Sequence, residues 1–174
     1  MPLDTRIRNI QNGSYVKDLN NEMNKFTGTW RFNDGTSSFT LIIQKQENVF
    51  NGDYYRDYLV GEYAYTLNGI EVINTLSSLN TPLNQYNNIG GKNVVIGQDY
   101  GCEDCINNER RFRLYFIDPE RKYLSTTLII RYLVDESNPE KITATIISRG
   151  SAVIPVDGYT SPRVPYGTYL MEKQ

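Results

Sequence analysis

The stretch GCEDC, residues 101–105, contains both cysteines of this 174-residue chain. A catalytic dithiol needs a lowered thiol pKa, and the charges of Glu103 and Asp104 oppose thiolate formation. A tetrahedral zinc site needs four ligands, but the chain has no histidine and no second cysteine pair. We therefore expect a local disulfide between Cys102 and Cys105, with free thiols as the alternative in a cytosolic protein.

The acidic residues of the same stretch raise the question of calcium. Asp99, Glu103 and Asp104 lack the alternating ligand pattern of a calcium loop, so solvated loop charge is the better interpretation and no metal is expected. The absence of histidine removes the commonest general base and the usual partner of a catalytic serine or cysteine. We predict a non-enzymatic protein with no catalytic residues and no cofactor.

Aromatic and aliphatic side chains supply candidates for a ligand cavity. The chain has 14 tyrosines, and several of them fall on strand-like segments where their phenol groups need a hydrogen-bond partner or a polar ligand. The same side chains could equally fill a small barrel without binding anything. The candidate lining residues, which alternate toward one face of their segments, are Tyr63, Tyr65, Phe112, Leu114 and Phe116.

Charge and hydropathy limit the classes of partner. The net charge is −2, with 18 basic and 20 acidic residues spread without blocks, so no nucleic-acid partner is expected. No segment approaches the apolar length of a membrane span. The first residues lack the pattern of a signal peptide, which is typical of a cytoplasmic protein if Met1 is native and leaves open a mature exported protein whose signal has been removed. Oligomeric state cannot be derived from the sequence.

Apolar residues recur at a spacing of two, which is typical of strands. Asn33-Asp34-Gly35 and Asn68-Gly69 predict the turns of two hairpins, and the second hairpin joins 59–67 to 70–76. Residues 77–92 are expected to form a long surface loop. Further strands are expected at 93–97, 111–117, 123–133, 141–149 and 168–173.

One helical signal precedes these strands. Val16, Leu19, Met23 and Phe26 are spaced by three and four residues, with Ser14 as a candidate N-cap, so a short helix that plugs the barrel floor is expected. An irregular arm across the outer wall is the alternative. The expected fold is a single all-β domain over 1–174, with an arm over 1–25 and an antiparallel lipocalin-like barrel of eight to nine strands over 26–174.

Several stretches carry a resemblance to a known family. The GTW at residues 28–30, after a helical segment and before meandering hairpins, resembles the lipocalin or calycin superfamily. More specifically, YVKDLNNEMNKFTGTW, RFRLYFIDPERKYL and the closing YLMEKQ resemble an uncharacterised family of lipocalin-like proteins from Bacteroidetes, a domain of unknown function. The resemblance implies an exported protein and brings no catalytic residues.

The lipocalin likeness gives Trp30 and Gly28 a structural role. In such barrels the tryptophan packs across the closed end, with a cation from a late strand over its face. Arg131 and Arg149 are the candidates for that cation.

Two functions remain open from the sequence. One is an exported, non-catalytic carrier that holds a small apolar or amphipathic molecule inside the barrel. The other is an envelope or surface interaction module whose barrel is filled by side chains. An open apolar cavity would favour the carrier, and a filled interior would favour the interaction module.

Overall fold

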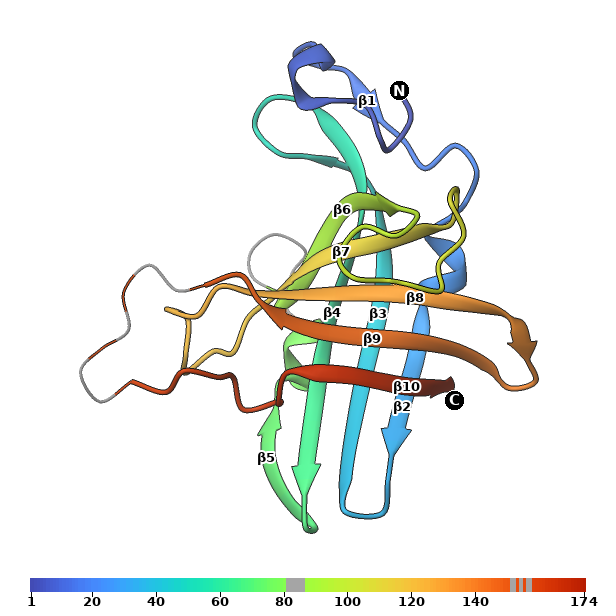
Figure 1. The fold of residues 1–174 in the computed structure, drawn as a ribbon. Coiled ribbons are helices and arrows are strands. Elements are labelled where there is room, and N and C mark those ends of the chain that lie inside the picture. Colours follow the sequence, from blue (N-terminus) through green and yellow to red (C-terminus); the bar gives the residue numbers. More distant parts are fainter. Residues whose placement is uncertain (81–86, 151–152, 154, 156–157) are drawn as a thin grey trace.

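In the computed structural model, the alternating strands join into one sheet that closes into an antiparallel barrel (Figure 1). The structure describes residues 1–80, 87–150, 153, 155 and 158–174. Eight strands form the ring in the order β4-β3-β2-β10-β9-β8-β7-β6, and β6 pairs back with β4. Their bounds are β2 Gly28–Asn33, β3 Ser37–Phe50, β4 Tyr55–Leu67, β6 Ile89–Ile96, β7 Arg110–Phe116, β8 Thr126–Ser137, β9 Glu140–Ser148 and β10 Gly167–Lys173. The predicted all-β barrel is confirmed.

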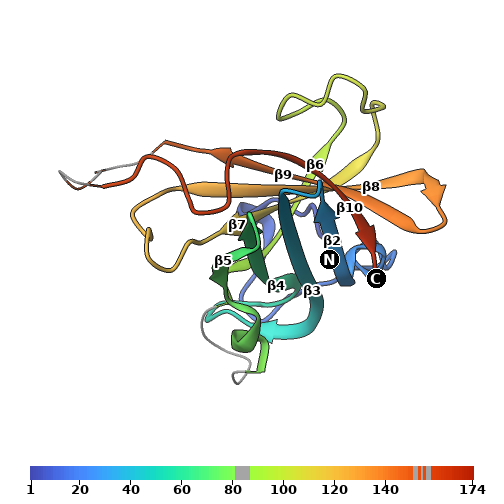
Figure 2. The same ribbon diagram turned by 90° about the horizontal axis from the view of Figure 1, so that it is seen from below.

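Two further strands lie outside the ring, both against β4. β1 (Tyr15–Val16) pairs with it in parallel at one end, and β5 (Ile70–Asn74) pairs antiparallel at the other. Strands β2 to β5 run steeply across β8, β9 and β10 (Figure 1), and the hairpin of β8 and β9 projects beyond the ring in the view from below (Figure 2). Steeply tilted strands are what closure of a small barrel requires.

The two predicted turns form as expected. Asn68 and Gly69 have φ angles of 51° and 76°, the left-handed values that a type I′ turn needs, and they join β4 to β5. At the turn between β2 and β3, the Asp34 carboxylate accepts the backbone N–H groups of Thr36 and Ser37 at 2.9 and 2.6 Å. Backbone conformation at Asn68-Gly69 and the Asp34 hydrogen bonds therefore fix the strand register of the two hairpins.

Strand β6 begins four residues before the predicted start of its strand. The predicted loop 77–92 instead contains the end of a 3-10 turn, η3 (Leu76–Asn80), and the first residues of β6, while 81–86 lie outside the described residues. Gly90 and Gly91 suggested a loop, but both lie in β6. A Cβ on Gly90 would come within 2.5 Å of the Tyr115 hydroxyl oxygen, so the glycine leaves room for that ring.

The N-terminal segment is an irregular arm with short 3-10 turns rather than a helix of regular length. The turns are η1 (Ile7–Asn9) and η2 (Asn24–Phe26). Asn21 has a φ of 55°, which interrupts any helix, and Leu19 is 59% exposed, so the apparent helical periodicity does not describe a buried face. No helix among the described residues is long and apolar enough to cross a membrane.

Candidate functional site

The barrel interior is occupied by side chains. The five residues predicted to line a ligand cavity all lie in one core cluster and are at most 4% exposed. The rings of Tyr63 and Phe116 stack with centroids 4.4 Å apart, and Phe39 packs edge-on against Tyr63 and Tyr65 at 6.2 and 6.3 Å. The predicted lining residues are therefore brought together in one packed core cluster.

The interior phenol of Tyr63 also has a protein partner. Its hydroxyl donates to the carbonyl oxygen of Ile117 at 2.9 Å, and burial raises the pKa of Tyr63. On the other side of the core, Phe112 packs edge-on against Phe26 with centroids 5.4 Å apart. The 3-10 turn η2 thus places an aromatic plug against β7, and the Tyr63 phenol needs no ligand to satisfy it.

Trp30 is fully buried at the seam between β2 and β10, beside this plug. Its indole N–H donates to the carbonyl oxygen of Phe26 at 2.8 Å. Gly28 has a φ of 125°, and a Cβ there would lie 3.1 Å from Cε of Lys173. The Lys173 side chain runs through this space and places its Nζ 5.3 Å from the Trp30 ring centroid.

The cation over Trp30 is therefore Lys173, and the expectation that Arg131 or Arg149 covers the ring is wrong. Arg131 instead pairs with Glu109 at 2.6 Å and with Asp104 at 2.7 Å. Arg149, which follows β9, lines an external groove. The physical reason is register: Lys173 is the direct partner of Trp30 in the ladder between β10 and β2.

The two cysteines form the predicted disulfide, Cys102 to Cys105. Asp104 lies close by, with an oxygen 3.5 Å from Sγ of Cys102, but its carboxylate pairs with Arg131. The hydrogen bonds from Arg131 lower the pKa of Asp104. Both thiols are used in the disulfide, so this cluster offers no thiolate ligand for a metal.

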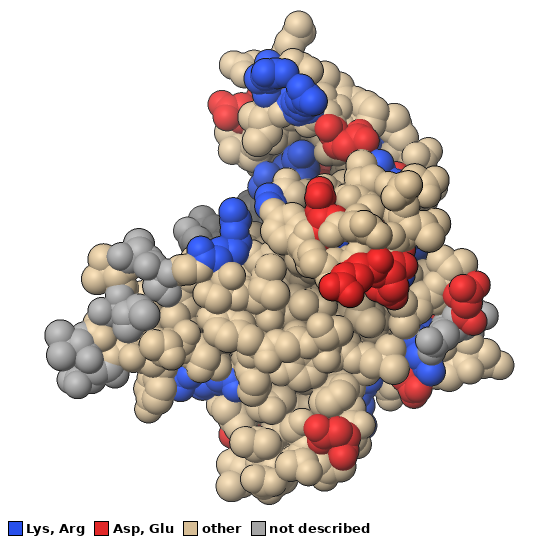
Figure 3. All heavy atoms as spheres, viewed as in Figure 1, with Lys and Arg blue, Asp and Glu red and all other residues tan. Residues whose placement is uncertain are grey.

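The main cavity of the described residues is a groove on the outer wall of the barrel, about 650 Å³ in volume. It lies between the barrel and the N-terminal arm and crosses mainly the outward faces of β3, β4, β6, β7 and β8, and it also reaches the core side chain of Leu114. Basic side chains gather along this hollow edge below the arm (Figure 3). Its principal lining residues are Ile7, Gln44, Gln46, Tyr54, Arg56, Tyr58, Val60, Leu79, Asn87, Gly90, Gly91, Lys92, Asn93, Arg113, Leu114, Tyr115, Ser125, Thr126, Thr127 and Arg149. We call it the outer groove.

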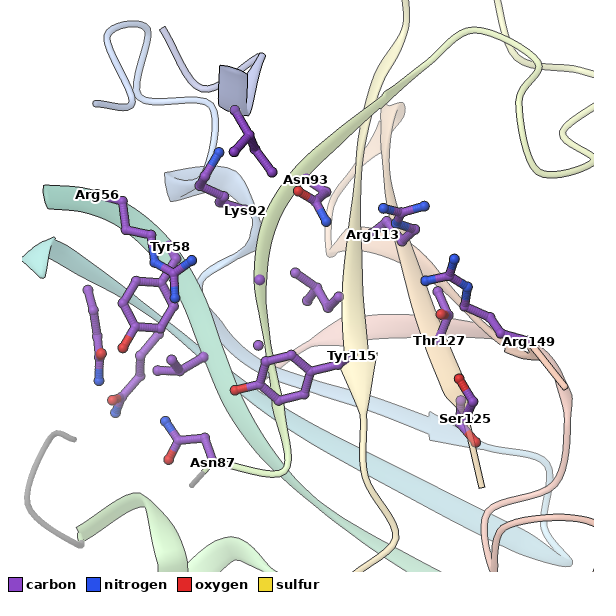
Figure 4. A pocket seen from close by; sticks show the side chains of 18 of the residues that line it. Arg56, Tyr58, Asn87, Lys92, Asn93, Arg113, Tyr115, Ser125, Thr127 and Arg149 are labelled. Carbon is purple, nitrogen blue, oxygen red and sulfur yellow. The ribbon is translucent and has the colours of Figure 1, made fainter. Parts of the chain in front are cut away.

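Four cations and no carboxylate line the described part of the outer groove. Figure 4 shows Arg56 and Lys92 at one end, and Arg113 and Arg149 at the other. Tyr115 points into the space between the two ends from β7. No acid lies within this lining, so basic side chains are concentrated in the groove on a protein of net charge −2.

The floor of the groove combines bare backbone with aromatic rings. Gly90 pairs with Tyr115 in the ladder between β6 and β7, and the Tyr115 ring lies across it. Tyr115 is 45% exposed, so part of its ring is open to a ligand. The guanidinium carbon of Arg56 lies 5.1 Å from the centroid of Tyr58, which orients both side chains along the outward face of β4.

Polar atoms of this site are left without partners inside the protein. Nε of Arg56 and Oε1 of Gln46 are buried and have no hydrogen-bond partner. An unpaired buried polar group costs about 1–3 kcal/mol. Lys92 is 8% exposed, and burial and the charge of Arg56 lower its pKa.

The arm that forms one wall of the groove is held by a buried carboxylate. Asp57 of β4 is fully buried and accepts the Tyr15 hydroxyl at 2.5 Å, the Asp18 N–H at 2.9 Å and the Asn48 N–H at 3.0 Å. Although burial raises its pKa, these bonds hold the pKa of Asp57 below its usual value. Within the arm, the carbonyl oxygen of Leu3 accepts a hydrogen bond from Nζ of Lys92 at 3.5 Å.

None of the four groove cations was predicted from the sequence to belong to one site. Arg56, Lys92 and Arg113 lie on three neighbouring strands, and Arg149 follows a fourth. In the sequence they are isolated charges, and the segment that contains Lys92 read as a loop. The available signal was the outward alternation of Arg113 and Tyr115 in β7, opposite the inward face of Phe112 and its neighbours.

Comparison with known proteins identifies a family. A model described as Family of unknown function (DUF6705) matches residues 5–174. A search of curated proteins and a search of solved structures each gave no match.

Proposed function

Since the chain belongs to the family of unknown function DUF6705, its activity must be inferred from its site, and we propose that it is a non-catalytic binding protein whose ligand occupies the outer groove. The barrel then serves as a rigid scaffold. The main support for this proposal is the contrast between the filled barrel interior and the open outer groove. The interior side chains pack against one another, whereas the outer groove has a volume within the range of about 300–1,000 Å³ that ligand sites occupy.

We thus favour binding on the outer surface of the barrel over a carrier that holds its ligand inside the barrel. Tyr63 and Phe116 stack in the place where a guest would lie in a carrier of this kind, and the Tyr63 hydroxyl already has a partner. The outer groove has the opposite character, because its lining contains four cations and polar atoms of Arg56 and Gln46 that have no partner in the protein. Such a site favours an anionic ligand.

The disulfide supports an exported location as part of the same proposal, because disulfides persist in oxidising compartments. Two resemblances agree with this location: the lipocalin-like motif at Gly28 and Trp30, and the likeness of the longer stretches, such as RFRLYFIDPERKYL, to a family of exported proteins from Bacteroidetes. In this proposal the protein acts at the cell envelope or outside the cell, where it captures its ligand without chemical change.

An anionic aromatic dye tests where binding occurs. 8-Anilinonaphthalene-1-sulfonate carries a ring system for Tyr115 and a sulfonate for Arg113, so it should bind at one saturable site. We expect Arg113→Gln to weaken that binding at least fivefold, and Phe112→Leu in the interior to leave it within twofold. Arg31→Gln, an exposed arginine on β2, is the matched control. Binding that is lost with Phe112→Leu and unaffected by Arg113→Gln would assign the ligand to the barrel interior instead.

A further inference from the structure

The placement of the groove's charges and rings points to a more specific ligand, and this inference rests on the proposed function. We propose that the outer groove binds an acidic oligosaccharide, with one carboxylate at the Arg56 end, another at the Arg149 end, and a sugar ring over Tyr115 between them.

The spacing of the cations supports a ligand with separated negative groups. Arg56 and Lys92 come from β4 and β6, and Arg113 and Arg149 come from β7 and the end of β9, with Tyr115 between the two pairs (Figure 4). A single small anion would engage only one pair. Arginine guanidinium groups match the planar geometry of carboxylates, which favours uronic-acid units at the two ends.

The neutral polar side chains of the lining are suited to binding sugar hydroxyl groups. Amide and hydroxyl side chains both donate and accept hydrogen bonds, as sugar hydroxyls do. Aliphatic side chains are few, which disfavours an acyl chain. The neutral polar residues of the lining are Gln44, Gln46, Asn87, Asn93, Ser125, Thr126 and Thr127.

The ring of Tyr115 supplies the stacking surface. It lies across Gly90 and remains 45% exposed, so the apolar face of a sugar ring can rest on it above bare backbone. A Cβ on Gly90 would lie 2.5 Å from the hydroxyl oxygen and 2.7 Å from Cζ of Tyr115. In the Gly90→Ala variant, the added methyl group would therefore displace the Tyr115 ring. Its nearest contacts would be with the outer end of that side chain and not with backbone.

Single-stranded nucleic acid is a weaker match for these features. Such strands are bound by grooves that follow a phosphate at every nucleotide, and binding proteins of that class carry extended basic surfaces. Here the cations form two pairs at the ends of one short groove, on a chain of net charge −2.

The experiment compares four probes by isothermal titration calorimetry on the full chain: a galacturonic acid trimer, maltotriose as the neutral trisaccharide, a thymidine oligonucleotide and inorganic phosphate. We expect the galacturonate trimer to bind best, at least tenfold more tightly than maltotriose, and to weaken as salt is raised. Tighter binding of the oligonucleotide, binding of phosphate alone, or equal binding of maltotriose would overturn the inference.

Variants test whether one ligand spans both ends. Arg56→Gln and Arg149→Gln should each weaken galacturonate binding about tenfold, and their effects should multiply in the double variant. Gly90→Ala should weaken it with little change in melting temperature, and Arg31→Gln should change neither. An effect confined to one end would refute the spanning geometry.

The dye experiment separates this inference from the proposed function. If the dye remains in the groove while no galacturonate binds, the ligand class is wrong and the groove is still the binding site. If the dye binding depends on Phe112 rather than on Arg113, both proposals fail.

Discussion

Asp57 offers the sharpest test of how the N-terminal arm is attached to the barrel. Its carboxylate is fully buried and accepts one hydroxyl and two backbone N–H groups, from Tyr15, Asp18 and Asn48. Hydrogen bonds to a charged group contribute about 1.5–3 kcal/mol each, and burial of the carboxylate offsets part of that sum. We expect Asp57→Ala to lower the free energy of unfolding by about 3–4 kcal/mol.

The isosteric variant Asp57→Asn refines the test. One carboxylate oxygen accepts both Tyr15 and Asn48, and the other accepts Asp18. An amide can keep the first two bonds through its oxygen, while its NH₂ group faces the Asp18 N–H. Asp57→Asn should therefore cost about half as much as Asp57→Ala, with the loss concentrated at Asp18.

The pH dependence follows from the lowered pKa of Asp57. A carboxylate whose pKa is lower in the folded state stabilises the protein above its unfolded pKa, about 3.9, and that contribution is lost as pH falls through the folded value. The difference between wild type and Asp57→Ala should thus be largest near neutral pH and shrink below about pH 4.

Urea unfolding followed by Trp30 fluorescence gives the free energies, and hydrogen exchange at the Asp18 and Asn48 amides reports local opening of the arm. A loss below about 1 kcal/mol for Asp57→Ala, with unchanged exchange at both amides, would refute the role assigned to Asp57. Equal losses for Asn and Ala would refute the division of hydrogen bonds between its two oxygens.

Three further predictions concern the core, the groove and the disulfide. Trp30→Ala should cost about 3–5 kcal/mol by circular dichroism, as truncation of a buried aromatic does, and a loss below about 1 kcal/mol would contradict its packing role. Lys92→Met should stabilise the protein by about 0.5–2 kcal/mol near pH 7, because the lowered pKa of Lys92 means that its charge is unfavourable when folded. That gain should fade as pH rises through the lowered pKa, and lower stability of the variant at pH 7 would contradict it. Cys102 and Cys105 should take up alkylating reagent only after reduction, with under about 3 kcal/mol of stability lost, and two free thiols in native protein would contradict the disulfide.

Alternation of inward side chains was enough to predict the barrel and most of its strands. The left-handed turn at Asn68-Gly69 and the inward face of Phe112 depend on short-range chemistry, so both can be derived from sequence. The beginning of β6 could not be derived from sequence, because glycines are typical of loops. Gly90 instead leaves room for the ring of Tyr115, which lies on another strand.

The arm and the groove depend on contacts that sequence spacing does not reveal. The apparent helix ending at Phe26 is overridden by the attachment of the arm to β4 through Asp57. The cation over Trp30 is set by ladder register, which pairs it with Lys173. Arg56 and Arg149 belong to the groove only because the sheet closes, so the site is a product of topology rather than of a motif.

The pairing of β2 with β10 has a consequence for synthesis of the protein. Trp30 lies directly opposite Lys173, so the ring cannot close until β10 has emerged from the ribosome. Until then, the nascent chain presents the unpaired edge of β2, and unpaired edges invite pairing with other chains. Emergence of β10, rather than of any earlier strand, is thus the step that commits this protein to its barrel.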